Sequence, residues 1–141
     1  MNVLFLCRAN VFRSQMAEAF FNKYSKGKPF LAKSAALIGA EPMDKHVIEA
    51  MKNLNMDLSK NITKNISKEM VDWADLFIIM NSNLDPFFKI AIKDRKNVKF
   101  ETWHIKDMQE GYPEDRRLAF FSKTRDKIEI KVKDLIERTS K

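Results

Sequence analysis

The chain has one cysteine, two histidines and no apolar run approaching the roughly 20 residues that a membrane span requires. A single cysteine excludes a disulfide framework, and without a signal-peptide pattern it predicts a reducing, cytoplasmic environment. So few histidines and cysteines, with no close-spaced cluster, predict no metal site and suggest no cofactor. No aromatic or glycine-rich binding motif points to a nucleic-acid partner. We therefore expect neither a membrane nor a nucleic acid as partner.

The length and composition indicate one folded domain that spans residues 1–141. Hydrophobic residues make up 45% of the chain and include 11 phenylalanines and 8 methionines, enough for a continuous core. The sequence has no internal repeat, low-complexity tract or linker that would divide it.

Basic residues exceed acidic ones, with 26 Lys and Arg against 19 Asp and Glu and a net charge of +7. Such an excess favours acidic partners such as phosphates and other oxyanions. The lysines are nevertheless scattered from Lys23 to Lys141 without a dense block. They are typical of solvated faces, so charge alone identifies no ligand.

Apolar patterning predicts strands that alternate with helices along the chain. Strands are expected at residues 2–7, 30–35, 74–80 and 97–103. Helices are expected at residues 14–24, 47–54, 68–73 and 118–136, with one more that Asp85 caps and Pro86 begins. This order predicts an α/β fold in three layers, a parallel sheet covered by helices on both faces.

The carboxyl ends of the predicted strands carry Cys7, Ser34, Met80 and the segment after Trp103. In parallel sheets of this kind, ligands bind beyond the carboxyl ends of the strands. The sequence therefore predicts one shared site at this edge.

The segment from Cys7 to Ser14 connects the first expected strand to the first expected helix. Its peptide N–H groups and the positive end of the helix dipole can converge on one anion. The residues expected to bind a phosphate or similar oxyanion are Arg8, Ala9, Asn10, Val11, Phe12 and Arg13. A thiol at the edge of this cradle predicts phosphoryl chemistry through a cysteine nucleophile.

Individual side chains of this loop have distinct expected roles. The positive field favours the thiolate of Cys7, and the planar fork of Arg13 can hold two oxygens at once. The Ser14 hydroxyl can donate to the sulfur, Asn10 tolerates a positive φ in a tight loop, and Arg8 can steer an anion at the entrance. A cysteine that ends a buried strand can also be inert. The strand before it, the helix after it and the neighbouring Arg and Ser favour the catalytic interpretation.

The stretch CRANVFRSQMAEAF resembles the phosphate-binding loop of the low-molecular-weight protein tyrosine phosphatases and of the related thioredoxin-coupled arsenate reductases. The likeness extends to Ser34-Ala35-Ala36, ADLFIIM, TWHIKDM and RRLAFFSKTRDKI. It implies a four-stranded parallel sheet and a covalent cysteinyl intermediate. Asn10 and Ser34 are the residues expected to support the loop.

The resemblance also implies a general acid on the loop after the last strand, where Asp107 matches the family's Asp-Pro pair. Asp115 is the alternative acid, although it is better suited to the start of the last helix. Met108 replaces the usual proline. The aromatic pair that follows that proline in tyrosine phosphatases is absent, so a phosphotyrosine ring loses its expected walls; Tyr112 is the next aromatic residue.

Three functions follow from these residues. The first is a phosphomonoesterase, acting through a phosphocysteine on Cys7 on a phosphorylated protein or a small phosphate. The second is an arsenate reductase, which would need an external thiol because the chain has no second cysteine. The third is a non-catalytic module that binds oxyanions.

Overall fold

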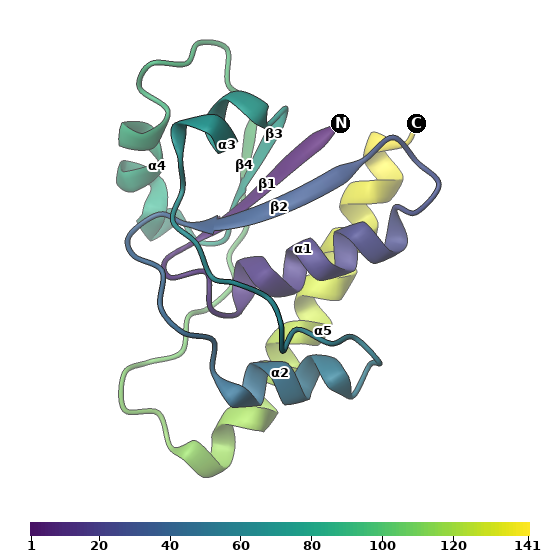
Figure 1. Cartoon of the computed structure of the whole chain (residues 1–141), viewed down its shortest axis with the longest axis vertical. Helices are drawn as coiled ribbons and strands as arrows, with labels where there is room; N and C mark the ends of the chain where they lie inside the picture. The colour runs from purple at the N-terminus through teal and green to yellow at the C-terminus, as the bar shows by residue number, and fades with distance from the viewer.

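The computed structural model describes residues 1–141 and has a four-stranded parallel sheet in the order β2-β1-β3-β4 (Figure 1). The strands are β1 (Asn2–Cys7), β2 (Leu31–Ala36), β3 (Leu76–Ile79) and β4 (Phe100–Thr102). The helices are α1 (Arg13–Tyr24), α2 (Lys45–Lys52), α3 (Lys68–Trp73), α4 (Asp85–Ala91), α5 (Glu114–Thr139) and the short 3-10 helix η1 (Ser82–Leu84). The predicted α/β fold with a parallel sheet is confirmed.

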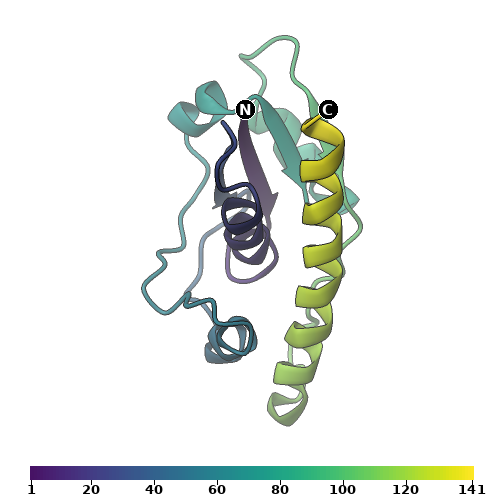
Figure 2. The same ribbon diagram turned by 90° about the vertical axis from the view of Figure 1, so that its right-hand side faces the viewer.

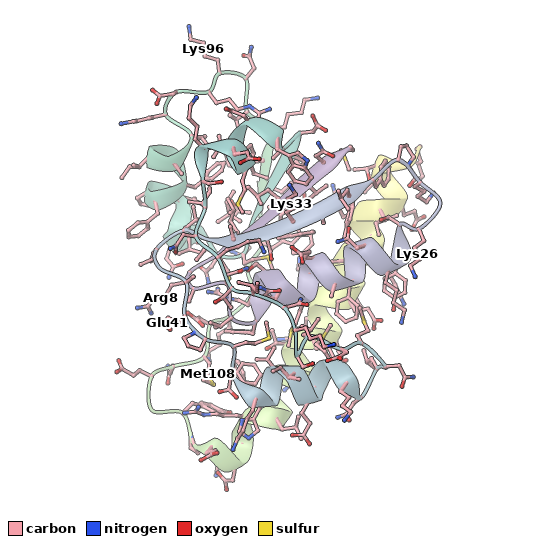
Figure 3. The ribbon with its side chains drawn as sticks, viewed as in Figure 1. Arg8, Lys26, Lys33, Glu41, Lys96 and Met108 are labelled. Atoms are coloured by element: carbon pink, nitrogen blue, oxygen red, sulfur yellow. The ribbon has the colours of Figure 1, made fainter.

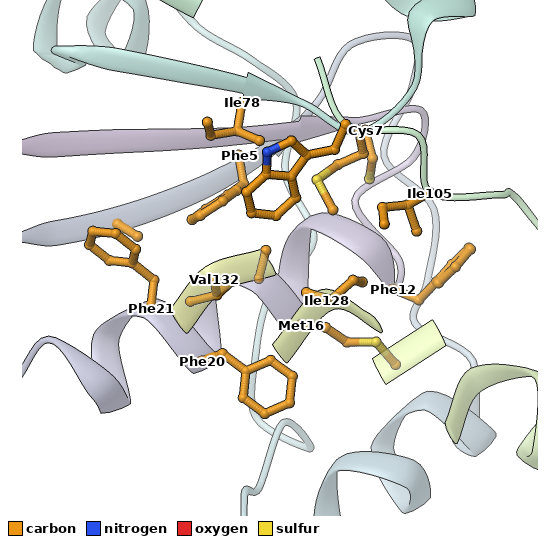
Figure 4. Packing of buried hydrophobic residues seen from close by; sticks show 14 of the residues in the cluster. Phe5, Cys7, Phe12, Met16, Phe20, Phe21, Ile78, Ile105, Ile128 and Val132 are labelled. Atoms are coloured by element: carbon orange, nitrogen blue, oxygen red, sulfur yellow. The ribbon is translucent and has the colours of Figure 1, made fainter. Parts of the chain in front are cut away.

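The sheet separates two hydrophobic cores because alternate β1 side chains point to opposite faces. Phe5 and Cys7 belong to the larger core, which α1, α2 and α5 complete. Leu4 and Leu6 belong to the smaller core, beneath α3 and α4. Figure 2 shows α1 and α5 side by side on one face, and Figure 4 shows the packing of the larger core. These are the predicted three layers.

The chain passes from one side of β1 to the other, since β2 and β3 flank it. In an open parallel sheet this reversal opens a crevice at the carboxyl end of the central strand. Cys7 is the last residue of β1 and lies at this point. The topology thus puts the cysteine where such folds bind ligands.

Most predicted boundaries differ from the structure by a few residues, and three of the differences are instructive. β2 starts one residue later than expected, and the ladder of β4 contains three residues of the expected 97–103. Asp85 does not cap α4, because η1 runs directly into the helix and makes Asp85 its first residue. Instead, Asn81 accepts a hydrogen bond from the backbone of Asn83 at the start of η1.

No helix is long and apolar enough to span a membrane.

Candidate active site

The cysteine sulfur is buried at the edge of a closed loop. The side chain of Cys7 is 2% exposed, and the backbone N–H of Asn10 donates to its Sγ over 3.2 Å. The hydroxyl of Ser14, from the first turn of α1, lies 2.8 Å from the same sulfur. Two donors from different parts of the loop can therefore stabilise negative charge on Sγ.

Asn10 holds the loop together with every hydrogen-bonding atom of its side chain. Its φ of 59° confirms the predicted left-handed conformation. Its Nδ2 donates to the hydroxyls of Ser14, over 2.8 Å, and Ser34, over 3.0 Å. Its Oδ1 accepts from Gln15 and from the backbone of Lys64. Since the Ser14 oxygen accepts from Asn10, its own proton is free to point at the sulfur.

Gln15 and the segment after α2 are parts of this network that the sequence analysis missed. Gln15 is buried on α1; its Nε2 donates to Asn10 and to the carbonyl of Ile62, and its Oε1 accepts from Asn61. These contacts fasten the long connection between α2 and α3 to the loop. The one available signal was a third consecutive polar residue, after Arg13 and Ser14, at the start of a buried helix.

Arg13 joins the loop to the opposite side of the site. The residue is 2% exposed, and its Nη1 donates to the carbonyl of Ile105 over 3.0 Å. Its Nη2 lies 3.3 Å from Oδ2 of Asp107. The third nitrogen, Nε, is buried and has no hydrogen-bond partner. A buried donor without a partner costs free energy, and a bound oxyanion would supply the missing acceptor.

These groups surround a pocket of about 390 Å³. One wall is the loop, represented by Cys7, Arg8, Ala9, Val11, Phe12 and Arg13. The rest of the lining comes from three segments and consists of Glu41, Pro42 and Asp44, of Asp107, Met108 and Glu110, and of Phe121. The structure thus brings together Cys7, Arg13 and Asp107 from opposite ends of the sequence. Asn10, although a residue of the loop, does not line the pocket; its buried side chain, with those of Ser14 and Ser34, supports the loop from the protein interior.

The rings of two aromatic residues near the site pack against other aromatic rings. Phe12 is buried against Phe121, with ring centroids 5.0 Å apart, and contributes only part of the pocket wall. Tyr112 packs on Phe120 at 5.3 Å and does not line the pocket. Neither ring stands free at the mouth to stack on an aryl group. Asp115 lies in the first turn of α5, as expected, and outside the pocket.

The comparisons with known proteins cover nearly the whole chain. Residues 2–141 match the family model of the low molecular weight phosphotyrosine protein phosphatases. An arsenate reductase of Bacillus subtilis (strain 168) is 30% identical over 136 residues, which are 96% of this chain and 94% of that protein.

Two solved structures show the same fold. A low molecular weight protein tyrosine phosphatase from T. tengcongensis has a TM-score of 0.79 and 29% identity, over 98% of this chain and 99% of that one. The YwlE arginine phosphatase from Geobacillus stearothermophilus has a TM-score of 0.82 and 24% identity, over 99% and 92% of the two chains. Family model, relative and fold agree, so this chain belongs to the low molecular weight phosphotyrosine protein phosphatase family, which has arsenate reductases among its relatives.

Proposed function

We propose that this protein hydrolyses phosphate monoesters through a phosphocysteine on Cys7. The proposal rests on two features found in the same pocket. The Cys7 sulfur lies within hydrogen-bond distance of two donors, and the buried Nε of Arg13 has no acceptor. A nucleophile and an unfilled oxyanion donor at one pocket are what phosphoryl transfer needs. A module that only binds oxyanions would use the donor but would not need the thiolate.

In the first half-reaction, the Cys7 thiolate attacks phosphorus and the bond from phosphorus to the ester oxygen breaks. Asp107 gives its proton to the departing oxygen, so that an alcohol leaves. Arg13 and the loop amides hold the three phosphoryl oxygens while charge spreads over them.

In the second half-reaction, a water attacks the phosphocysteine and gives a proton to the Asp107 carboxylate. Inorganic phosphate forms and the thiolate leaves, with Ser14 donating to the sulfur as its negative charge returns. The contact between Arg13 and Asp107 positions this carboxyl group for both steps, because it holds the group beside the buried Nε donor that would bind a phosphoryl oxygen.

The test uses Cys7→Ser and Asp107→Asn on aryl phosphates whose leaving groups differ in pKa. Cys7→Ser should lower kcat by roughly 10⁴-fold or more, while phosphate still binds. Asp107→Asn should slow the poorest leaving group most, by roughly 100-fold, and the best leaving group least. Turnover by Cys7→Ser near the wild-type rate would rule out the mechanism. If Asp107→Asn lowers kcat equally for every ester, Asp107 is not the general acid.

Arsenate reduction is the second candidate, favoured by the relative from Bacillus subtilis whose name is arsenate reductase. With one cysteine in the chain, an internal disulfide relay is impossible. An external thiol would have to attack the sulfur of a cysteinyl arsenate, forming a mixed disulfide with Cys7 while the sulfur–arsenic bond breaks and arsenite leaves; a second thiol would then reduce the disulfide. Arsenate consumption that depends strictly on added glutathione or another thiol, without hydrolysis of aryl phosphates, would favour this function.

A further inference from the structure

Carboxylates line the part of the pocket outside the phosphate-binding loop, although the protein as a whole has a net charge of +7. Four acidic residues line it, against two arginines. An excess of negative charge beside an oxyanion site opposes the binding of a simple dianion. Negatively charged side chains around the pocket of a phosphatase therefore require an explanation.

Two of the four carboxylates are already paired. Asp44 contacts Nη1 of Arg117 over 3.1 Å and Nδ1 of His46 over 2.9 Å. Asp107 pairs with Arg13. The other two, Glu41 and Glu110, are exposed and have neither an ion pair nor a side-chain hydrogen bond. Together with the exposed and unpaired Arg8, they are the charges of the lining that remain available to a ligand, and the carboxylates outnumber the arginine.

Glu41 is attached directly to the phosphate-binding loop. Its backbone N–H donates to the carbonyl of Ala9 over 3.2 Å. The N–H groups of Ile38 and Gly39 donate to the carbonyl of Arg8, over 3.1 and 3.3 Å. Figure 3 shows Arg8 and Glu41 next to each other, with Met108 close by across the pocket. This backbone pairing holds the Glu41 carboxylate at the pocket rim.

Glu110 reaches the pocket from the other side, on the loop that carries Asp107. A turn closes here, with the N–H of Tyr112 donating to the carbonyl of Gln109 and Gly111 at a φ of 77°. The two free carboxylates thus come from two different loops, and the buried donor of Arg13 marks where the phosphate would lie.

We propose that Glu41 and Glu110 select phosphorylated peptides with a lysine or arginine beside the phosphorylated residue. This inference rests on the proposed function and names the substrate class of that site. The cationic neighbour would pair with the rim carboxylates while the phosphate enters the loop. With no free aromatic ring at the mouth, charge is the rim's means of discrimination.

The experiment compares three phosphotyrosine peptides that differ only in the two residues flanking the phosphotyrosine, which are Lys, Gln or Glu. The wild type should have a kcat/KM about tenfold or more higher for the Lys peptide than for the Glu peptide at low salt, and the ratio should shrink as salt screens the charges. In the double variant Glu41→Gln, Glu110→Gln, the ratio should fall to about threefold or less. That variant should also have a lower KM for p-nitrophenyl phosphate, because the repulsion is gone.

Glu49→Gln is the matched control, since Glu49 is exposed on α2 and does not line the pocket. This variant should keep the wild-type preference. An unchanged preference in the double variant, or equal kcat/KM values for all peptides in the wild type, would overturn the inference.

Binding of the same peptides to Cys7→Ser separates this inference from the proposed function. If the wild type hydrolyses none of the peptides and no aryl phosphate, the proposed function is wrong. The affinities of Cys7→Ser for the three peptides would then decide this inference alone, and equal affinities would reject it.

Discussion

The two sides of the pocket are built in different ways. The loop from Cys7 to Arg13 is tied to α1, β2 and the connection after α2 through Asn10, whose side chain has a partner at every polar atom. The opposite loop is anchored at Ile105, where the backbone N–H donates to the carbonyl of Met80. From Asp107 onward it is partly or fully exposed. A buried, fully satisfied network holds its geometry, whereas an exposed loop costs less to displace.

This contrast suggests a division of labour. The rigid side can be preorganised for the phosphoryl group, which is the same in every substrate. The exposed side carries the proposed acid and one of the selective carboxylates, which act on the part of the substrate that varies. Arg13 connects the two sides through Ile105 and Asp107.

Among changes that test the contrast between the two sides, the largest effect should come from replacing this connection with Arg13→Lys. A lysine keeps the charge but lacks the planar fork, so it cannot hold two phosphoryl oxygens and contact the opposite loop together. We expect kcat to fall roughly 10³-fold in steady-state assays with an aryl phosphate.

The matched control is Arg125→Lys, because Arg125 donates to the carbonyl of Ala50 and does not line the pocket. Its kcat should stay near the wild-type value. Similar losses of kcat in both variants would mean that Arg13 has no special role between the two sides.

A smaller effect should follow from Asn10→Gly, which keeps the left-handed backbone but removes the network. Four hydrogen bonds are lost, two of them to the buried hydroxyls of Ser14 and Ser34, so we expect the free energy of unfolding to drop by about 2 kcal/mol or more. Urea unfolding measures this change, and kcat should fall with it.

Asn55→Gly tests whether the backbone conformation alone matters. Asn55 has nearly the same φ, 60°, but is exposed, and no side-chain hydrogen bond involves it. We expect a change within about 0.5 kcal/mol. Equal changes in the two variants would contradict the importance of the Asn10 network.

The smallest effect concerns Asp44, on the carboxylate side of the pocket. Partial burial acts to raise the pKa of Asp44, but hydrogen bonds from His46 and Arg117 outweigh it and hold that pKa below its usual value. A lowered pKa in the folded state stabilises the protein above the unfolded value of about 4, and this stabilisation is lost as the pH falls through the folded pKa.

Asp44→Asn keeps the helix cap on α2 but removes the charge. Near neutral pH the wild type should exceed the variant by about 1 kcal/mol in free energy of unfolding, and the difference should vanish once the pH falls below the lowered pKa of folded Asp44. Urea unfolding at a series of pH values measures it. A difference that grows toward low pH would contradict this assignment.

Local sequence predicted the rigid side of the pocket well. Cys7, Asn10, Arg13 and Ser14 lie within one strand, loop and helix, so spacing alone brings them together. The positive φ of Asn10 followed from residue type. The alternation of apolar segments was likewise enough to predict a three-layer α/β fold.

Patterns in the local sequence could not predict contacts between residues that are far apart along the chain. The contact between Asn10 and Lys64 joins residues 54 positions apart, and that between Gln15 and Asn61 joins residues 46 apart. Lys64 and Asn61 lie between two predicted helices, in a segment for which the local sequence predicted no contact. The interpretation of Asp85 as a cap was also wrong, because a preceding 3-10 turn changed which residue begins the helix.

The sequence by itself determined the parallel α/β fold and the strand, loop and helix that present Cys7, because these depend on apolar periodicity and on neighbouring residues. The tertiary structure alone decided which polar groups meet across the pocket: the contact of Arg13 with Asp107, the anchoring of Asn10, and the position of Glu41 against the loop. Such pairings depend on how the strands are ordered and how the loops pack, and a pattern of residue types along one chain does not encode them locally.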